Sequence, residues 1–423
     1  MKKLILLAGV VGALCALEAK PRIESPARNA VVPLVKAEQK AFLDRTREGR
    51  RAWLADLKQR AQSEKVGCEP AKVPLAWTGA KGGVEVSVRR ARDGRVVFAT
   101  NAVDLAKVEI DNLEIACAYT WRVADAEGAD EAVFTTEDYA PRFIRVPKIE
   151  NLRDLGGRIG LGGRRVRQGL VYRSVGLNEN ARRVYLSTKQ LEAAYADGSL
   201  EQLLATTTDL NLKPTDVKKY VAKIRGYIKT DTHLPDRYGK RFLLTAKLKP
   251  GAERLTPETR AYMTDVLGIR TDLDLRSFAE VFGMEGSPLG PKAKWVHIPF
   301  SAYGGMGETE GKEPFKKAFR VFLDEANYPI DFHCIAGADR TGSLAFILNG
   351  LLGVAEEDLY RDWETTAFTA RSKGFNHKER FDRLVKVFDA FSGETINARI
   401  EAYVLSLGFT AADIAKFRAI MLE

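Results

Sequence analysis

The sequence predicts an α/β domain, whose central, mostly parallel sheet is flanked by helices, preceded by an all-β sandwich module. A chain of 423 residues is too long for one ordinary hydrophobic core, so we expect at least two domains. Residues 328–352 have the pattern of a strand, a glycine-bounded loop and a helix, which is the repeating unit of α/β sheets. Residues 70–138 instead carry short alternating runs separated by turn residues, which favours a β-sandwich.

The loop at residues 333–342 concentrates chemically active groups. It places Cys334 and Arg340 six positions apart, directly before a run with apolar residues at helical spacing. The N-terminus of a helix offers free backbone N–H groups and a positive dipole end, which bind phosphate and lower the pKa of a thiol. The Arg340 guanidinium adds a planar fork of donors for two phosphate oxygens. The pattern therefore predicts a thiolate nucleophile, an anion cradle and an arginine clamp.

These residues resemble the phosphate-binding loop of the cysteine-dependent phosphatases, whose signature is H-C-x5-R-[ST]. His333, Cys334 and Arg340 take its main positions, followed by Thr341 and Gly342. The segments 151–157 (Asn-Leu-Arg-Asp-Leu-Gly-Gly) and 274–277 (Asp-Leu-Arg-Ser) resemble a bacterial branch of the tyrosine phosphatases. The resemblance covers residues 145–423 and implies hydrolysis of a phosphomonoester through a Cys334 thiophosphate intermediate.

The resemblance also implies roles for individual residues. We expect the catalytic groups to be Cys334, Arg340 and Asp339. We expect substrate to be bound by Ile335, Ala336, Gly337, Ala338, Thr341 and Arg153. Supporting roles fall to His333, Asp274 and an Arg276–Glu280 pair. No metal ligands are expected, because the four histidines are scattered along the chain, and the mechanism needs no cofactor.

The proton donor departs from the pattern of many relatives. They carry an aspartate on a mobile loop after the strand that corresponds to residues 295–299. Here residues 300–307 contain no aspartate, and the nearest acids are Glu308, Glu310 and Glu313. Asp339, beside Arg340, is therefore the first candidate for the general acid, with Asp274 as a further candidate. A loop-bracing role for Asp339 remains open.

The remaining segments give a domain plan. Residues 1–19 have the charged start and short apolar core of a secretory signal, so we expect an exported, periplasmic or secreted protein without a transmembrane segment. Residues 20–67 are assigned to a helical or linker segment, and 68–140 resemble a fibronectin type III-like module. The catalytic domain follows at 145–423, with a helical insertion at about 180–262. Cys68 and Cys117 form either a disulfide or two free thiols.

The net charge and the distribution of basic residues indicate which classes of ligand the protein binds. The net charge of +10 favours anionic ligands, but no basic tract is interleaved with aromatic residues as in a nucleic-acid groove. We expect a phosphorylated protein or a small phosphomonoester as substrate, and no nucleic acid. Phosphotyrosine, phosphoserine or phosphothreonine, inositol phosphates and phosphoinositides all stay open, as does the oligomeric state. The rival classes are an inactive phosphate-binding protein and a redox protein that uses Cys334.

Overall fold

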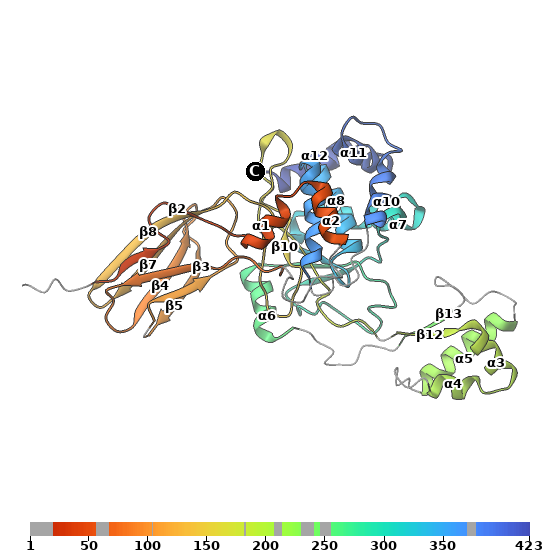
Figure 1. Cartoon of the computed structure of the whole chain (residues 1–423). Helices are drawn as coiled ribbons and strands as arrows, with labels where there is room; N and C mark the ends of the chain where they lie inside the picture. The colour runs from red at the N-terminus through yellow and green to blue at the C-terminus, as the bar shows by residue number, and fades with distance from the viewer. Residues whose placement is uncertain are drawn as a thin grey trace, which may run out of the picture. The chain divides into compact units, whose positions relative to one another are not determined.

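The computed structural model describes most of the chain and divides it into two compact units (Figure 1). The described residues are 20–55, 67–103, 105–181, 183–206, 214–229, 241–245, 255–369 and 378–423. The first unit combines residues up to Leu34 with Ala71–Tyr139, and the second combines Val35–Pro70 with Ala140–Glu423. The expected signal segment, 1–19, lies outside the described residues.

The first unit contains two β-sheets. One is antiparallel, with the strand order β1 (Arg22–Ser25), β3 (Val73–Thr78) and β6 (Lys107–Ile110). The other has the order β2 (Ala30–Val32), β8 (Gly128–Thr136), β7 (Ala118–Asp125), β4 (Val84–Arg90) and β5 (Val96–Ala102), with only β2 and β8 parallel. The alternation in β7 buries Tyr119, Trp121 and Val123 on one face, as the period of a strand requires.

The boundary of this unit differs from the predicted one. Strands β1 and β2 lie in the segment that the sequence assigned to a linker, yet they pair with β3 and β8. Strands of four and three residues are too short to show a periodicity. Their partner strands also lie about fifty to one hundred residues away in the chain, so no local pattern marks the pairing. The likeness to a fibronectin type III module stays a prediction.

The second unit is built on a six-stranded sheet with the order β15-β14-β16-β11-β10-β9. Its strands are β9 (Arg142–Phe143), β10 (Arg153–Asp154), β11 (Val171–Ser174), β14 (Thr271–Asp274), β15 (Lys294–His297) and β16 (Ile330–His333). The strands from β15 to β11 run parallel to one another, and β10 is antiparallel to both of its neighbours, β11 and β9. The carboxyl ends of β14 and β16 therefore meet at one edge, where ligands bind in open α/β sheets.

Helices accompany this sheet (Figure 1). The larger ones are α7 (Thr309–Phe322), α8 (Asp339–Leu351), α9 (Glu356–Glu364), α10 (Lys378–Phe388), α11 (Ile396–Ser406) and α12 (Ala411–Met421). Short turns are the 3₁₀ segments Leu161–Gly163, Tyr303–Gly307, Glu325–Asn327 and Thr365–Phe368, and a π-helical turn at Tyr262–Val266. Helix α8 is buried from Thr341 to Leu351, as a helix in the middle of a domain must be. The phosphate-loop helix thus has a fixed position.

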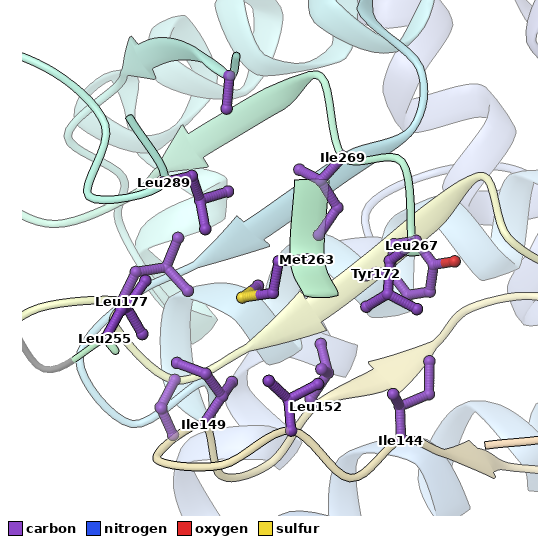
Figure 2. Close-up of a cluster of buried hydrophobic side chains, with 13 residues drawn as sticks. Ile144, Ile149, Leu152, Tyr172, Leu177, Leu255, Met263, Leu267, Ile269 and Leu289 are labelled. Carbon is purple, nitrogen blue, oxygen red and sulfur yellow. The ribbon is translucent and has the colours of Figure 1, made fainter. Parts of the chain in front are cut away.

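A separate apolar cluster packs around β11 and the segment before β14 (Figure 2). It includes Ile144, Leu152, Leu177, Leu255 and Met263, all nearly inaccessible to solvent. The helix α6 (Pro257–Ala261) lies between the last two of these residues in the chain. Residues 255–262 therefore belong to the core of this unit and not to the predicted insertion.

The insertion itself is a small module. It contains β12 (Arg183–Ser187), α3 (Thr188–Ala196), α4 (Leu200–Thr206), α5 (Pro214–Lys229) and β13 (Arg241–Thr245). The three helices match the predicted helical character, and bury Leu191, Leu204, Val221 and Ile224 in a core of their own. The antiparallel pair β12–β13, which brings the two ends of the module together, was not predicted.

The segment predicted as helix or spacer is part of the second unit. It forms α1 (Ala37–Leu43) and α2 (Arg47–Ala55), whose Phe42 and Trp53 rings pack with Phe368. The buried Arg50 side chain forms ion pairs with Glu364, which is also buried, and with half-exposed Glu357. These contacts make α2 an integral layer of the unit. No helix among the described residues combines the length and the apolar character needed to cross a membrane.

Arg50→Ala should destabilise the second unit by about 3–5 kcal/mol, because it leaves the Glu364 carboxylate buried and unpaired. Arg51→Ala is the matched control on the same helix. Its partner Asp382 is partly exposed, so we expect a loss below about 1 kcal/mol. Chemical unfolding of the two variants measures the difference. Equal losses would show that the α2–α9 ion pair does not hold the helix in place.

Candidate active site

The predicted loop lies between β16 and α8, as the sequence pattern requires. Cys334 directly follows the strand and is 1% exposed. Gly337 takes a left-handed φ of 64°, and a Cβ atom there would lie 2.4 Å from the carbonyl oxygen of Ser174. Only glycine allows this approach. The loop is therefore curled tightly against the end of β11, with Ile335 and Ala336 half-buried and Ala338 and Thr341 buried.

The environment of Cys334 favours a thiolate. Burial raises the pKa of its thiol, but the Arg340 charge and the nearby hydroxyl and backbone N–H of Thr341 lower it by more, so the net shift is downward. Asp339 opposes part of this shift. The Thr341 Oγ1 atom is buried and has no hydrogen-bond partner among the described residues. A thiolate at this position can attack an electrophilic phosphorus.

Arg340 is held by a carboxylate in a fork-to-fork arrangement. Its Nη1 and Nη2 atoms donate to Glu280 Oε2 at 2.6 Å and Oε1 at 3.2 Å. Glu280 Oε2 also accepts from the backbone N–H of Ser277 at 2.6 Å. The structure thus pairs Glu280 with Arg340, and corrects the predicted Arg276–Glu280 pair. The planar fork is oriented before any ligand binds.

Arg276 instead pairs with Asp274 at the end of β14. Its Nη2 and Nε atoms donate to the carboxylate at 2.6 and 2.9 Å, and both side chains are fully buried. Burial raises the pKa of Asp274, but His333 and Arg276 outweigh it and lower the pKa to about 2. A carboxyl group that is ionised and buried in this way is poorly suited to donate a proton, so Asp274 is the weaker acid candidate.

His333 is a buried cation beneath the loop. Its Nε2 atom donates to Asp272 Oδ1 at 2.8 Å, and its Nδ1 atom lies 3.3 Å from the carbonyl oxygen of Cys334. Burial lowers the pKa of His333, but Asp274 and Asp272 raise it to about 9. The imidazolium therefore connects Asp272 of β14 to the backbone of the nucleophile at the end of β16.

Asp339 begins α8 and is partly exposed at the loop. The Tyr303 hydroxyl, from the segment after β15, donates to its Oδ1 atom. Tyr303 was not among the predicted site residues, because no local motif marks it. It occupies the segment where relatives were expected to carry an aspartate.

A second unpredicted residue lies behind the loop. Asp362 of α9 forms ion pairs with Arg173, Arg158 and, at 3.5 Å, Arg153. Arg173 Nη2 donates to the carbonyl oxygen of Gly337 at 2.6 Å. Asn151 Nδ2 donates to the carbonyl oxygens of Ala336 and Gly337 at 3.0 and 3.1 Å. These hydrogen bonds fix the carbonyl groups of the loop, so the backbone N–H groups of the loop stay available to bind an anion.

Arg153 belongs to this network and does not line the site. Its side chain is fully buried and donates to Asn151 Oδ1 and to the carbonyl oxygen of Asp362. Burial and the neighbouring Arg173 lower its pKa to about 9. The structure therefore corrects the predicted substrate contact: Arg153 acts on the loop through Asn151. Asp154 of the same motif accepts the backbone N–H groups of Gly156 and Gly169, as a turn-forming residue does.

The other two described cysteines are free thiols. The Cys68 sulfur accepts a hydrogen bond from the backbone N–H of Asn151 at 3.4 Å, and Cys117 lies in the first unit, directly before β7. Burial raises the pKa of both thiols. The structure therefore contains no Cys68–Cys117 disulfide, which resolves the alternative that the sequence left open. Among the described residues, no cluster of three or more His, Cys, Asp or Glu side chains is arranged to hold a metal ion.

Comparison with known proteins found similarity to tyrosine phosphatases. Residues 250–423 match the sequence model of a tyrosine phosphatase family. A Cupriavidus necator protein with the provisional name tyrosine-protein phosphatase is 27% identical over 223 residues, which are 51% of this chain and 59% of that protein. The match thus spans little more than half the length of this curated relative. These matches support a phosphatase at the level of the family.

Two solved structures of a yeast enzyme show weak likeness. The core catalytic domain of the PP-IP phosphatase Siw14 from S. cerevisiae, in complex with citrate, has a TM-score of 0.22 and 20% identity, over 31% of this chain and 83% of that one. Another structure of the Siw14 catalytic core has a TM-score of 0.22 and 17% identity, over 33% and 84% of the two chains. At these scores the two structures decide neither the fold nor the substrate of this protein.

The pKa shifts predict an order of thiol reactivity. Because the thiolate is the reactive species, Cys334 should be carboxymethylated by iodoacetate at a lower pH than Cys68 or Cys117. Peptide mass spectrometry across a pH series measures this order, with the other two thiols as internal controls. Arg340→Met should move the Cys334 reaction to higher pH, because it removes the charge that stabilises the thiolate. Labelling of Cys68 before Cys334 would contradict the assigned nucleophile.

Proposed function

We propose that the protein is an exported, cysteine-dependent phosphomonoesterase of the tyrosine-phosphatase type. The observation that carries the proposal is a buried thiol with a lowered pKa, facing an oriented arginine on a loop that enters the N-terminus of α8. A helix N-terminus stabilises both the thiolate and a bound phosphate dianion. The family match at residues 250–423 supports the same reaction class.

In the proposed first step, Cys334 Sγ attacks phosphorus. The S–P bond forms while the bond from phosphorus to the leaving oxygen breaks, and that oxygen takes a proton from Asp339. Arg340 and the loop N–H groups stabilise the equatorial oxygens, which is the main protein contribution in phosphoryl transfer. In the second step, water attacks phosphorus and gives a proton to the Asp339 carboxylate. The S–P bond breaks, which releases inorganic phosphate and regenerates the thiolate.

An exposed aromatic group beside this site favours an aryl phosphate. Phe278 is 73% exposed, and it lies two residues before Glu280, the partner of Arg340. Its ring packs edge-on against His297, which stacks on Trp295 at 5.3 Å and accepts or donates a hydrogen bond at the carbonyl oxygen of Arg276. An apolar ring that is held in place and left uncovered gains free energy when an aromatic substrate packs on it. Phosphotyrosine is therefore the preferred substrate class.

Inositol phosphates and phosphoinositides are the alternative substrates on the same site. Several bacterial relatives with lipid activity carry a lysine where this chain has Ala338, and the missing charge disfavours densely charged ligands. An inactive scaffold is disfavoured by the retained Cys334, Arg340 and Thr341. A redox role is disfavoured because no second cysteine stands in a C-x-x-C arrangement with Cys334.

Export is proposed from the sequence of residues 1–19 alone, which combine two lysines with a short apolar run. A mature N-terminus at about residue 20 in the native protein would support it, and retention of Met1 would refute it.

Cys334→Ser should reduce hydrolysis of a phosphotyrosine peptide on the order of 10³-fold or more, because an alcohol at this position is a poor nucleophile. Binding of the same peptide should be retained. Cys117→Ser, in the first unit, is the matched control and should keep the wild-type rate. Steady-state kinetics and isothermal titration measure the two effects. Wild-type turnover by the Cys334→Ser variant would refute the thiophosphate mechanism.

Asp339→Asn should slow phenyl phosphate by about 10²-fold or more, since this leaving group needs a proton. Dinitrophenyl phosphate, whose leaving group is stable as an anion, should be affected much less. The basic limb of the pH–rate profile should also flatten, because it reports loss of the donor's proton. Glu308→Gln is the control acid near the same loop. Equal losses for both esters would assign Asp339 to loop structure.

Phe278→Ala should lower kcat/KM for a phosphotyrosine peptide about 5- to 10-fold, the expected loss of one aromatic contact. The rate with a small alkyl phosphate should change little. Phe282→Ala, in the same loop and 39% exposed, serves as the control. An equal loss for aryl and alkyl substrates would remove the argument for an aromatic substrate.

A further inference from the structure

Tyr303 makes the contact that fixes the proposed proton donor. It is 7% exposed, and its hydroxyl donates to Asp339 Oδ1. Burial, followed by the Asp339 charge, raises the pKa of the Tyr303 phenol well above its usual value. The phenol therefore keeps its proton in the working pH range and serves as a permanent hydrogen-bond donor to one oxygen of the carboxyl group.

The backbone around Tyr303 holds the ring in this position. Tyr303 has a left-handed φ of 57°, and its N–H donates to Ser343 Oγ at 2.9 Å, which in turn donates to the carbonyl oxygen of Asp339 at 2.9 Å. The Tyr303 ring meets Trp363 edge-on, with ring centroids 6.5 Å apart. Three residues later, the carbonyl oxygen of Met306 accepts the Tyr403 hydroxyl at 2.8 Å. The segment is thus fastened at both ends of its 3₁₀ turn.

We propose that Tyr303 is a positioning residue that orients Asp339 for proton transfer to the leaving oxygen, an inference that rests on the proposed function. With Oδ1 engaged by the phenol, Oδ2 carries the transferable proton. As the P–O bond breaks, that proton moves from Oδ2 to the leaving oxygen and the electron pair of the O–H bond stays on the carboxylate. The Tyr303 hydrogen bond then stabilises the carboxylate charge. Water restores the proton in the hydrolysis of the thiophosphate.

The Tyr303 hydrogen bond sets the direction of the pH effect that we expect when the hydroxyl is removed. Cys334 and Arg340 act on it from the loop and α8, and Tyr303 from the segment after β15. A phenol that donates to a carboxylate favours the ionised form, so losing the hydroxyl favours the protonated form. Removal of the Tyr303 hydroxyl should therefore move the basic limb of the pH–rate profile to higher pH, while the Cys334 and Arg340 contributions stay the same.

The test compares Tyr303→Phe with Tyr403→Phe. Both changes remove one hydrogen-bonded hydroxyl, of a residue in or bonded to the same 3₁₀ turn, but only the Tyr303 hydroxyl contacts Asp339. We expect Tyr303→Phe to slow phenyl phosphate about 10-fold, with less than about 3-fold loss for dinitrophenyl phosphate and an upward shift of the basic limb. Tyr403→Phe should show neither leaving-group dependence nor the shift. The dinitrophenyl phosphate rate also reports that each variant is folded.

A double-mutant cycle completes the experiment. If Tyr303 acts through Asp339, then adding Tyr303→Phe to Asp339→Asn should cost no further rate with phenyl phosphate. Additive losses, equal losses for the two esters, or the same behaviour in Tyr403→Phe would each overturn the positioning role. These outcomes leave the proposed function intact, whereas a wild-type protein without phosphatase activity would refute that function itself.

Discussion

The site depends on the ion pairs between the buried Asp362 carboxylate and three arginine side chains. The carboxylate lies among the guanidinium groups of Arg153, Arg158 and Arg173, all of them buried, and their charges outweigh the effect of burial and lower its pKa well below the usual range. One carboxylate cannot neutralise three cations, so the cluster keeps a net positive charge. Replacement of Asp362 would leave three buried cations without this counter-charge in a low-dielectric interior, which is the costly case.

The arginines of this cluster hold the phosphate-binding loop in two ways, one direct and one through Asn151. Arg173 donates directly to the carbonyl oxygen of Gly337, and Arg153 orients Asn151, which donates to Ala336 and Gly337. With the carbonyl groups held from behind, their peptide planes are fixed, and the loop amides are preorganised before an anion arrives. On the other side, His333 and Arg276 balance Asp272 and Asp274 at the strand ends. The nucleophile is thus supported by two separate ionic networks.

The sequence was sufficient for the local parts of this arrangement. The strand, loop and helix around Cys334 were predicted because their signal lies within about 25 consecutive residues. Partner choice among charged residues was not predictable: Arg276 and Glu280 are near in sequence, yet each pairs with another residue. Asp362 lies 209 residues from Arg153, and Tyr303 lies 36 residues from Asp339. Such contacts depend on how the strands and helices pack, which no local pattern records.

The proposed proton donor, Asp339, lies on a part of the structure that these networks hold rigid. A donor on a mobile loop must be brought to the leaving group by closure in every cycle, and such steps often limit turnover. A donor at the first turn of α8 is carried by a buried helix, and moves with the same element that holds Arg340. The segment after β15 then has a different task. In place of an aspartate it carries Tyr303, whose hydroxyl donates to the Asp339 side chain, while Ser343 links the Tyr303 N–H to the Asp339 carbonyl oxygen. In the proposed mechanism, therefore, no loop has to close to bring the acid to the leaving group. The nucleophile, the arginine that binds the phosphate and the acid all lie on one loop and the helix that follows it.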